Sequence, residues 1–401
     1  MKAPWLAIVG IGTDGLDGLS AAARTLVSQA EWLVGGERHL AMIPHSGARR
    51  MTWGKPFNES AARVAALKGQ RVCVLASGDP MWFGAGASLT RLISPAEMTI
   101  MPHPGAFSLA AARLGWSLQE TLCLSAHGRS LDALALHLWP GLRLFLLAED
   151  GATPAQLAKW LVDRSFGSST MTVLENLGGP GERRRSAAAA AWTADDVDPV
   201  NTIALDLAAE PGAAPLARVP GLPDDAYHHD GQLTKREVRA VTLAALAPGP
   251  DSLLWDIGAG AGSIAIEWAR AGGRAVALEK NKARCAMIAH NAARLGVPQL
   301  VVVEGEAPAG IASLDGPPDA VFIGGGLTVP GVVEAAWNAL PPGGRLVANA
   351  VSVAGEMVLL AWQQAHGGTL TRLSVARLAD LGGMQGWRPL KPVTQYAGRK
   401  P

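Results

Sequence analysis

The sequence predicts an α/β protein of two domains, the second of which is a doubly wound parallel sheet. The chain has 401 residues, more than one ordinary domain, since domains commonly hold about 150 residues. Short apolar runs alternate with helical patterns through most of its length. Four prolines between Ala208 and Asp225 forbid a regular helix there. We therefore expect one domain at 1–210, a Pro-rich linker at 211–221 and a second domain at 222–401.

The half of the chain after the linker alternates most clearly. Thr234 and Glu237 have the spacing of a capping box, which predicts a helix that ends at the Pro248–Pro250 turn. This alternation continues to a strand at 345–349, after the glycine- and proline-rich turn at 341–344, and it favours a parallel sheet with helices on both faces. The predicted strands are 252–256, 274–278, 300–304, 319–323 and 345–349, and the predicted helices are 262–270, 281–295 and 329–340.

The half before the linker is also α/β but more interrupted. A weak helix pattern near 115–120 suggests two lobes, at about 1–115 and 116–210. The segment 181–191 (GERRRSAAAAA) is expected to be a solvated surface loop followed by a short helix. The predicted strands are 5–9, 72–76, 122–125, 143–147, 171–174 and 203–207.

Composition and charge exclude several classes of protein. The formal net charge of +1 provides no general attraction to nucleic acid or to an anionic membrane. No apolar run reaches the roughly 18 residues of a membrane span, and the first ten residues lack the apolar core of a signal peptide. Cys73, Cys123 and Cys285 lie far apart and form no C-x-x-C pair. We therefore expect a cytoplasmic protein that binds a small molecule and no metal.

A glycine-rich loop follows the first predicted strand of the C-terminal domain. The run DIGAGAG places Asp256 before a loop whose members are Gly258, Ala259, Gly260, Ala261 and Gly262. Glycines permit a sharp turn and a close approach to a ligand, and the helix start offers free N–H groups. Glu279 ends the next strand, where an acid suits two ribose hydroxyls.

Three interpretations of this loop remain open: an S-adenosylmethionine site, a dinucleotide site and a structural turn. The dinucleotide fingerprint needs a glycine at 263, where the chain has Ser263. Asp256 would repel a pyrophosphate but could face the cationic amino group of S-adenosylmethionine, which carries no phosphate. We favour the methyl-donor site. The residues Lys280, Gly305, Glu306 and Ala307 follow neighbouring strands and are added to it, the last three near the adenine.

The C-terminal motifs resemble the decarboxylating precorrin C15-methyltransferase family. They are GQLTKREVRAV at 231–241, DIGAGAG, GEAP at 305–308 and DAVFIGGG at 319–326, in this order. The resemblance implies a Rossmann-like methyltransferase domain in which Thr234, the glycine loop, Glu279 and Ala307 line the cofactor site and Lys235 stands beside the substrate. The chain departs from the family at Glu306, where Asp is more common, and in a second small residue of the glycine cluster.

Three loops of the N-terminal domain have the form of ligand loops. They are VGIGTDG at 9–15, SGDPMWFG at 77–84 and PGAFS at 104–108, each after a predicted strand or strand exit. In this order they resemble the tetrapyrrole methylase family, whose cofactor lies folded in a cleft between two lobes. SAHGR at 125–129 and ENLG at 175–178 narrow the match to the C5-methylating branch.

This second resemblance assigns roles to residues of the N-terminal domain. Asp79 is a candidate cap or ligand acceptor, and with His127 a candidate for substrate positioning or proton handling; His127 could also be a structural histidine. Arg129 offers a fork for a substrate carboxylate. The implied cofactor residues are Gly10, Gly12, Ser77, Gly78, Asp79, Phe83, Ala106, Phe107 and Ser108.

The two resemblances together imply one fused enzyme. It would use S-adenosylmethionine to methylate precorrin-6B at C5 and C15 and would decarboxylate the C12 acetate, which gives precorrin-8 in cobalamin biosynthesis. Lys235, Arg236 and Arg239 are then candidate carboxylate clamps, although Arg236 and Arg239 could instead decorate a solvated helix face. Related single domains form oligomers, so we expect a homo-oligomer. The alternatives are a cobalt-containing substrate, a nicotinamide oxidoreductase, or a scaffold with degenerate domains.

Overall fold

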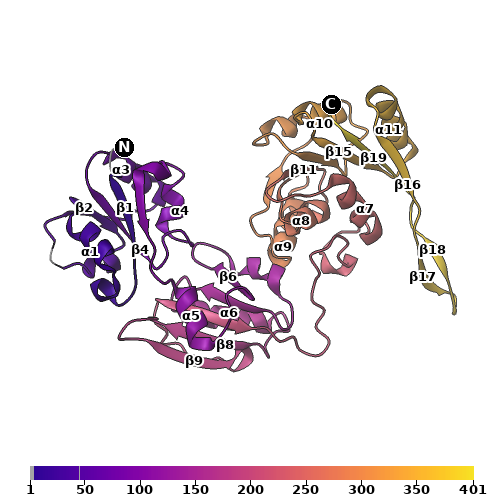
Figure 1. Cartoon of the computed structure of the whole chain (residues 1–401). Coiled ribbons are helices and arrows are strands. Elements are labelled where there is room, and N and C mark those ends of the chain that lie inside the picture. Colours follow the sequence, from indigo (N-terminus) through magenta and orange to yellow (C-terminus); the bar gives the residue numbers. More distant parts are fainter. Residues whose placement is uncertain (1–3, 45) are drawn as a thin grey trace. The chain divides into compact units, whose positions relative to one another are not determined.

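A computed structural model of the chain describes residues 4–44 and 46–401, without the side chain of Leu381 (Figure 1). Met1–Ala3 and His45, which belong to the expected first domain, lie outside the described residues. The chain forms two compact units: unit 1 holds the residues up to 131 together with 139–213, and unit 2 holds 132–138 together with 214–401. The division at 213–214 falls inside the expected linker at 211–221.

The first lobe of unit 1 is a parallel sheet of five strands in the order β3-β2-β4-β1-β5. Its central strands β1 and β4 are continuous apolar runs because both faces of the sheet are covered. Its elements are β1 Leu6–Ile11, η1 Gly15–Gly18, α1 Ala21–Ser28, β2 Trp32–Gly35, α2 Glu37–Ala41, β3 Arg49–Thr52, α3 Phe57–Ala66, β4 Val72–Ser77, α4 Ala85–Leu89, η2 Pro95–Glu97 and β5 Met98–Met101.

The second lobe of unit 1 is a mixed sheet in the order β6-β7-β10-β8-β9, in which the neighbours β6 and β7 pair in parallel and the other neighbouring strands pair antiparallel. Its elements are α5 Ala106–Leu114, β6 Thr121–Ser125, β7 Arg143–Leu147, α6 Thr153–Val162, β8 Thr170–Glu175, β9 Arg183–Ala188, η4 Ala189–Ala191 and β10 Asn201–Asp206. The helix α5 packs on this sheet, where Phe107 meets Phe145. The two lobes therefore divide before α5 and not near 115, and the residues 115–120 form no helix.

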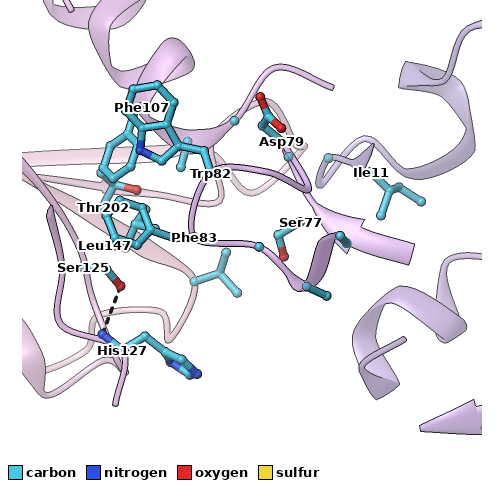
Figure 2. A pocket seen from close by; sticks show the side chains of 18 of the residues that line it. Ile11, Ser77, Asp79, Trp82, Phe83, Phe107, Ser125, His127, Leu147 and Thr202 are labelled. Atoms are coloured by element: carbon cyan, nitrogen blue, oxygen red, sulfur yellow. Dashed lines mark hydrogen bonds between the residues drawn. The ribbon is translucent and has the colours of Figure 1, made fainter. Parts of the chain in front are cut away.

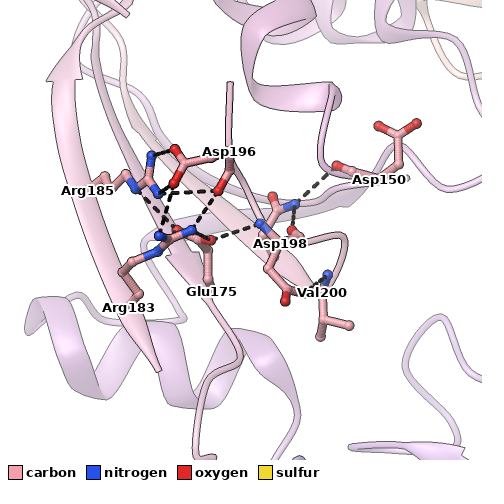
Figure 3. A network of polar contacts seen from close by, with 8 residues as sticks. Asp150, Glu175, Arg183, Arg185, Asp196, Asp198 and Val200 are labelled. Carbon is pink, nitrogen blue, oxygen red and sulfur yellow. Dashed lines mark hydrogen bonds and ion pairs between the residues drawn. The ribbon is translucent and has the colours of Figure 1, made fainter. Parts of the chain in front are cut away.

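The segment 181–191 corrects another prediction, because most of it is strand β9. β9 pairs antiparallel with β8 and carries Arg183 and Arg185 beside the buried Glu175 (Figure 3). Arg183 donates to both carboxylate oxygens of Glu175, and Asp196 accepts from both arginines. These partners lie 8 to 13 residues away from the arginines along the chain. The arginine run is thus part of an edge strand. Its arginines form ion pairs with acidic residues that lie too far along the chain for a local pattern to reveal.

Unit 2 is built on a sheet of seven strands in the order β13-β12-β11-β14-β15-β19-β16. The first five are parallel, as predicted, but β19 runs antiparallel to both β15 and β16. The five predicted strands are thus parallel as expected, and the sheet as a whole is mixed because it also contains β19, for which no strand was predicted. The strands are β11 Leu253–Ile257, β12 Arg274–Glu279, β13 Val301–Glu304, β14 Ala320–Ile323, β15 Arg345–Ala350, β16 Thr369–Leu373 and β19 Val393–Arg399.

The helices of unit 2 pack on the sheet, and a separate hairpin pairs β17 with β18. The helix α7 begins at Arg236 with Lys235 as its N-cap, so Thr234 is not the cap. Asp224 supplies the missing acceptor, because its Oδ1 accepts from the Arg236 N–H at 2.9 Å. The remaining elements are η5 Asp224–Ala226, α7 Arg236–Leu246, α8 Ser263–Arg270, α9 Lys282–Arg294, η6 Ala309–Ser313, α10 Val332–Ala339, α11 Val353–His366, β17 Ala376–Leu381 and β18 Met384–Pro389, together with η3 Leu131–His137 earlier in the chain.

None of the described helices is long and apolar enough to cross a membrane. Within 4–44 and 46–401, no group of three or more His, Cys, Asp or Glu side chains is placed to hold a metal ion.

Candidate functional sites

The N-terminal site is a cavity of about 860 Å³ within unit 1. It lies where the strands β1, β4, β6 and β7 end, so it occupies the carboxyl edges of both sheets. Figure 2 shows Ser77, Asp79, Phe83, Phe107 and His127 around it. Of the predicted residues, those that line it are Gly12, Ser77, Gly78, Asp79, Phe83, Ala106, Phe107, Ser108 and His127.

Two predicted residues of this domain are not among the described lining residues. Gly10 lies behind the loop that follows β4, where a Cβ would overlap the carbonyl oxygen of Gly78. Because Gly10 has no side chain, the backbone of β1 can approach the backbone of the loop at Gly78. Arg129 places its guanidinium 5.2 Å from the ring centroid of Phe83, a cation–π contact at the side of a lining residue.

The glycine loops around the cavity contact one another through backbone atoms. Gly78 has a φ of +55°, and a Cβ there would stand 2.6 Å from the Cα of Gly105. The Gly105 backbone cannot yield to a side chain at this point, so position 78 needs glycine. Thr13 fixes the first loop to the second lobe, since its hydroxyl donates to the carbonyl of Leu177 at 2.6 Å.

An aromatic turn forms one part of the cavity wall. The Asp79 carboxylate accepts from the Met81 N–H at 2.8 Å and so caps the turn. Trp82 and Phe83 follow, half exposed, and both meet the edge of Phe107 at 6.1 Å between ring centroids. Phe83 has a φ of +55°, a strained conformation for a bulky side chain.

The cavity also contains residues that the motifs did not reveal. His39 and Arg38 both contact the Ser77 hydroxyl, through Nε2 at 2.9 Å and Nη2 at 3.1 Å. Burial, reinforced by the charge of Arg38, lowers the pKa of His39 to about 4, so its ring is neutral near pH 7. Both side chains come from α2, which follows the Gly35–Gly36 pair at the end of β2, a signal that was not used. The spatial closeness of α2 to β4 identifies them as part of the cavity.

The C-terminal site begins where β11 enters the glycine loop. Glu279, at the end of β12, is buried and accepts from the Gly260 N–H at 2.9 Å through Oε2 and from the Asn281 N–H at 3.0 Å through Oε1. A carboxylate has about four acceptor positions, so each oxygen keeps one for a ligand. Gly258 has a φ of +68° and lies against Gly325, whose Cα would be 2.7 Å from a Cβ on Gly258.

Asp256 lies beneath this loop and is only 1% exposed. Its Oδ2 accepts from the Ala265 N–H at 3.1 Å, while Oδ1 is buried without a hydrogen-bond partner among the described residues. Burial raises the pKa of Asp256 to about 7; the bond from Ala265 opposes this, and the charge of Glu279 adds to it. An unpartnered buried carboxylate oxygen is suited to a cationic ligand group.

The segment before α7 lies close to the glycine loop. The buried amide of Asn291 donates to the carbonyls of both His228 and Ala261. The Thr234 carbonyl accepts from Arg239, and Lys235 is partly exposed at the start of α7. On the neighbouring strand, the Gly305 N–H donates to the Glu279 carbonyl at 3.0 Å, which sets the 305–307 turn beside the loop.

Three of the predicted ligand residues have other partners. Arg239 is 0% exposed and donates through Nε to Glu267 at 2.5 Å and through Nη2 to the Leu222 carbonyl. It is therefore neither a substrate clamp nor part of a solvated face, whereas Arg236 is exposed. Lys280 and Glu306 form an ion pair of 2.9 Å in which both side chains are more than half exposed. Such a pair lies on the rim of the site.

Comparison with known proteins gives each unit a counterpart. Residues 6–191 match the model of the tetrapyrrole (corrin/porphyrin) methylases, and residues 225–400 match that of the precorrin methyltransferase domain. A precorrin-6Y C(5,15)-methyltransferase [decarboxylating] of Sinorhizobium sp. is 48% identical over 99% of this chain and 97% of that protein. A protein of the same name from Mycobacterium tuberculosis is 41% identical over 98% of this chain and 99% of that protein.

A crystal structure of the C-terminal domain of a precorrin-6Y C5,15-methyltransferase from Rhodobacter capsulatus is 45% identical, with a TM-score of 0.44; it covers 46% of this chain and is itself covered completely. Fold, glycine loops and matched models together define a fused pair of C-methyltransferase domains. The chain belongs to the precorrin-6Y C5,15-methyltransferase (decarboxylating) family. The two resemblances drawn from the motifs are thereby confirmed.

Proposed function

We propose that this chain methylates precorrin-6B, also named precorrin-6Y, at C5 and C15 and decarboxylates its C12 acetate, with S-adenosylmethionine as the methyl donor. The observation that carries the proposal is the match to the Sinorhizobium protein, which extends over 97% of that protein and so includes both domains. Unit 1 would serve C5, and unit 2 would serve C15 and the decarboxylation. The product would be precorrin-8, in cobalamin biosynthesis.

The residues of both sites suit S-adenosylmethionine. In unit 1, the cavity is lined by Gly12, Gly78 and Ala106. Because these residues have small side chains or none, a ligand can approach their backbone atoms closely. In unit 2, Glu279 has acceptor positions left for ribose hydroxyls, and the orphaned Oδ1 of Asp256 suits a cationic amino group. When bound, the sulfonium supplies a methyl group as an electrophile.

The chain itself has to hold the macrocycle in line and keep water out. In unit 1, Phe83 and Phe107 give the cavity an apolar wall, Arg129 lies beside that wall as a fork for a substrate carboxylate, and Asp79 and His127 face the same cavity. In unit 2, Lys235 is partly exposed and Arg236 is exposed at the start of α7, where both would meet the carboxylates of the ring. The buried Arg239 is withdrawn from this set.

We also propose that the protein works in the cytoplasm as a homo-oligomer. Three free cysteines, one of them buried, fit a reducing compartment. The helix α11 exposes Val353, Met357 and Leu360 along one side, an apolar surface that a second copy could cover.

The test is mass spectrometry of precorrin-6B incubated with the full chain and S-adenosylmethionine. Two methyl groups add about 28 Da and the loss of carbon dioxide removes about 44 Da. Gly78→Val should stop one methylation and Gly258→Val the other together with the decarboxylation. If the mass stays unchanged although S-adenosylmethionine is demonstrably bound, precorrin-6B is excluded as the substrate and the cobalt-containing precorrin is favoured. A parallel incubation with the cobalt-containing precorrin is the second assay.

A further inference from the structure

The N-terminal site must dispose of a proton. When a ring carbon exchanges hydrogen for a methyl group delivered as the equivalent of CH₃⁺, the carbon–hydrogen electron pair stays with the ring and H⁺ leaves. In unit 2 the loss of carbon dioxide turns a CH₂ that bears a carboxylate into a CH₃ and takes up one proton, so its two reactions balance. Given the proposed division of labour, on which this inference rests, only unit 1 has a net proton to remove.

Three histidines line the cavity of unit 1: His39, His103 and His127. His39 is a weak base, because burial holds its pKa near 4. His127 has an exposed side chain on the loop after β6. His103 comes from the turn between β5 and α5, and its side chain is 14% exposed. Of the three, only His103 pairs a ring nitrogen with a described carboxylate, Nε2 being 3.7 Å from Oδ1 of Asp14.

The Asp14 carboxylate carries a buried oxygen that has no hydrogen-bond partner among the described residues. Asp14 precedes the short helix η1, but its side chain makes no cap hydrogen bond. Its Oδ1 is buried and accepts no hydrogen bond from any described residue. A carboxylate oxygen buried in this way is costly unless a donor or a cation comes to it.

Two glycines make room for the pair. A Cβ on Gly12 would stand 2.5 Å from Oδ1 of Asp14 and 2.8 Å from Nε2 of His103, and a Cβ on Gly18 would overlap the same carboxylate. Gly12 itself lines the cavity. The first glycine loop turns the chain. It also leaves room for the carboxylate of Asp14 and the imidazole of His103 to lie side by side at the cavity wall.

We propose that His103 is the proton acceptor of the methylation in unit 1 and that Asp14 positions it and stabilises its protonated form. The neutral ring nitrogen of His103 takes the proton released by the macrocycle, and the imidazolium that forms lies beside the negative charge of Asp14. The other charged or titratable side chains that line the cavity are Arg38, His39, Lys55, Asp79, His127 and Glu149. Arg38 contacts Ser77 and His39, so its charge disfavours a proton on His39 and leaves His103 as the acceptor.

The test compares His103→Asn, Asp14→Asn and the matched control Asp17→Asn in the full chain. Asp17 lies in the same helix η1, with an exposed side chain outside the lining of the cavity. Both site variants should lower the maximal rate of C5 methylation about 100-fold, with the affinity for S-adenosylmethionine within about twofold of the wild type. C15 methylation and decarboxylation in the same reaction mixture report that the chain is folded, and Asp17→Asn should match the wild type.

Two further readouts distinguish a proton acceptor from a residue whose role is purely structural. In Asp14→Asn the acid limb of the C5 rate should move to lower pH, because the lost carboxylate no longer favours the imidazolium, and in His103→Asn that limb should disappear. A fall in rate with an unchanged pH profile, or a wild-type rate in His103→Asn, would overturn the proposal. A wild type that adds no methyl group would instead overturn the proposed function.

Discussion

The Glu279 carboxylate accepts a hydrogen bond of 2.9 Å from the Gly260 N–H, and this bond ties the end of β12 to the glycine loop after β11. Its other oxygen holds the Asn281 N–H at the start of α9. The side chain thus fixes the loop and faces the ligand edge at once. Through these two hydrogen bonds, one acid at the end of the second strand holds both the glycine loop and the start of α9.

Glu279→Gln should weaken S-adenosylmethionine binding at unit 2 about tenfold or more, because a hydrogen bond to a charged acceptor contributes about 1.5–3 kcal/mol. The KM for the donor in C15 methylation should rise, and C5 methylation should be unchanged. The matched control is Glu304→Gln, since Glu304 stands opposite Glu279 on β13 but is exposed. Equal donor KM values in the two variants would contradict this role.

Gly258→Ala should destabilise unit 2 by about 2 kcal/mol or more and abolish C15 methylation. The added Cβ would meet backbone atoms of Gly325 at 2.7–2.9 Å, and backbone has no rotamer with which to escape. Gly272→Ala is the comparison, because Gly272 has a φ of +102° but open space around it. It should cost only the conformational strain of about 1–2 kcal/mol and keep the activity. Urea denaturation and product masses measure both, and an active Gly258→Ala would show that the two loops can separate.

Asp256 should make the stability of unit 2 fall as the pH rises from about 4 to about 7. Burial raises the pKa of this carboxyl from its ordinary 3.8 to about 7, so over this window the folded chain keeps a proton that the unfolded chain has lost. The contribution is fully present below about pH 4 and is lost by about pH 7. Asp256→Asn should remove a slope of up to about 1.4 kcal/mol per pH unit in the free energy of unfolding.

The control for this titration is Asp315→Asn, which removes an exposed carboxylate from the same unit. Its unfolding free energy should follow the wild type at every pH. Parallel curves for Asp256→Asn and the wild type would mean that Asp256 ionises normally in the folded protein.

Arg239→Met should destabilise unit 2 by about 3–5 kcal/mol, because it leaves the Glu267 carboxylate buried and without its cation. Glu267 also accepts from the Leu222 N–H and the Tyr227 hydroxyl, so the loss extends to the segment before α7. Arg236→Met, one helical turn away and exposed, should change stability by less than about 0.5 kcal/mol. Chemical denaturation of both variants shows whether Arg239 is a buried ion-pair partner or a surface charge. Equal denaturation midpoints for the two variants would favour a surface charge.

Local patterns predicted the strands that carry the sites and missed those that depend on distant partners. Buried parallel strands such as β4 and β11 are continuous apolar runs and were found within a residue or two of their ends. The short strand β3 consists of Arg49–Thr52, mostly exposed, and leaves no hydrophobic signal. The strand β19 lies next to β15, from which it is separated along the chain by α11, β16 and the hairpin, and its antiparallel pairing has no βαβ pattern.

The sites show the same limit. Glycine loops that follow a strand identified the backbone turns at 12, 78 and 105–108 that line the N-terminal cavity. Arg38, His39 and His103 were missed because they lie outside the glycine loops, and Asp14, which lies inside the first loop, was missed because its neighbour His103 meets it only in the folded chain. Arg239 was misassigned for a related reason: its counter-ion Glu267 lies 28 residues away, so the sequence shows a cation on a helix and hides the acid that buries it.

The insertion of β19 between β15 and β16 has a consequence for synthesis on the ribosome. Every strand of unit 1 has been made by Asp206, so its two sheets can be completed while unit 2 is still being translated. Unit 2 must wait for residues 393–399 before β15 and β16 gain their shared neighbour. Until then a nascent chain presents two open strand edges, and it is at this late stage of translation that chaperone contact would matter most.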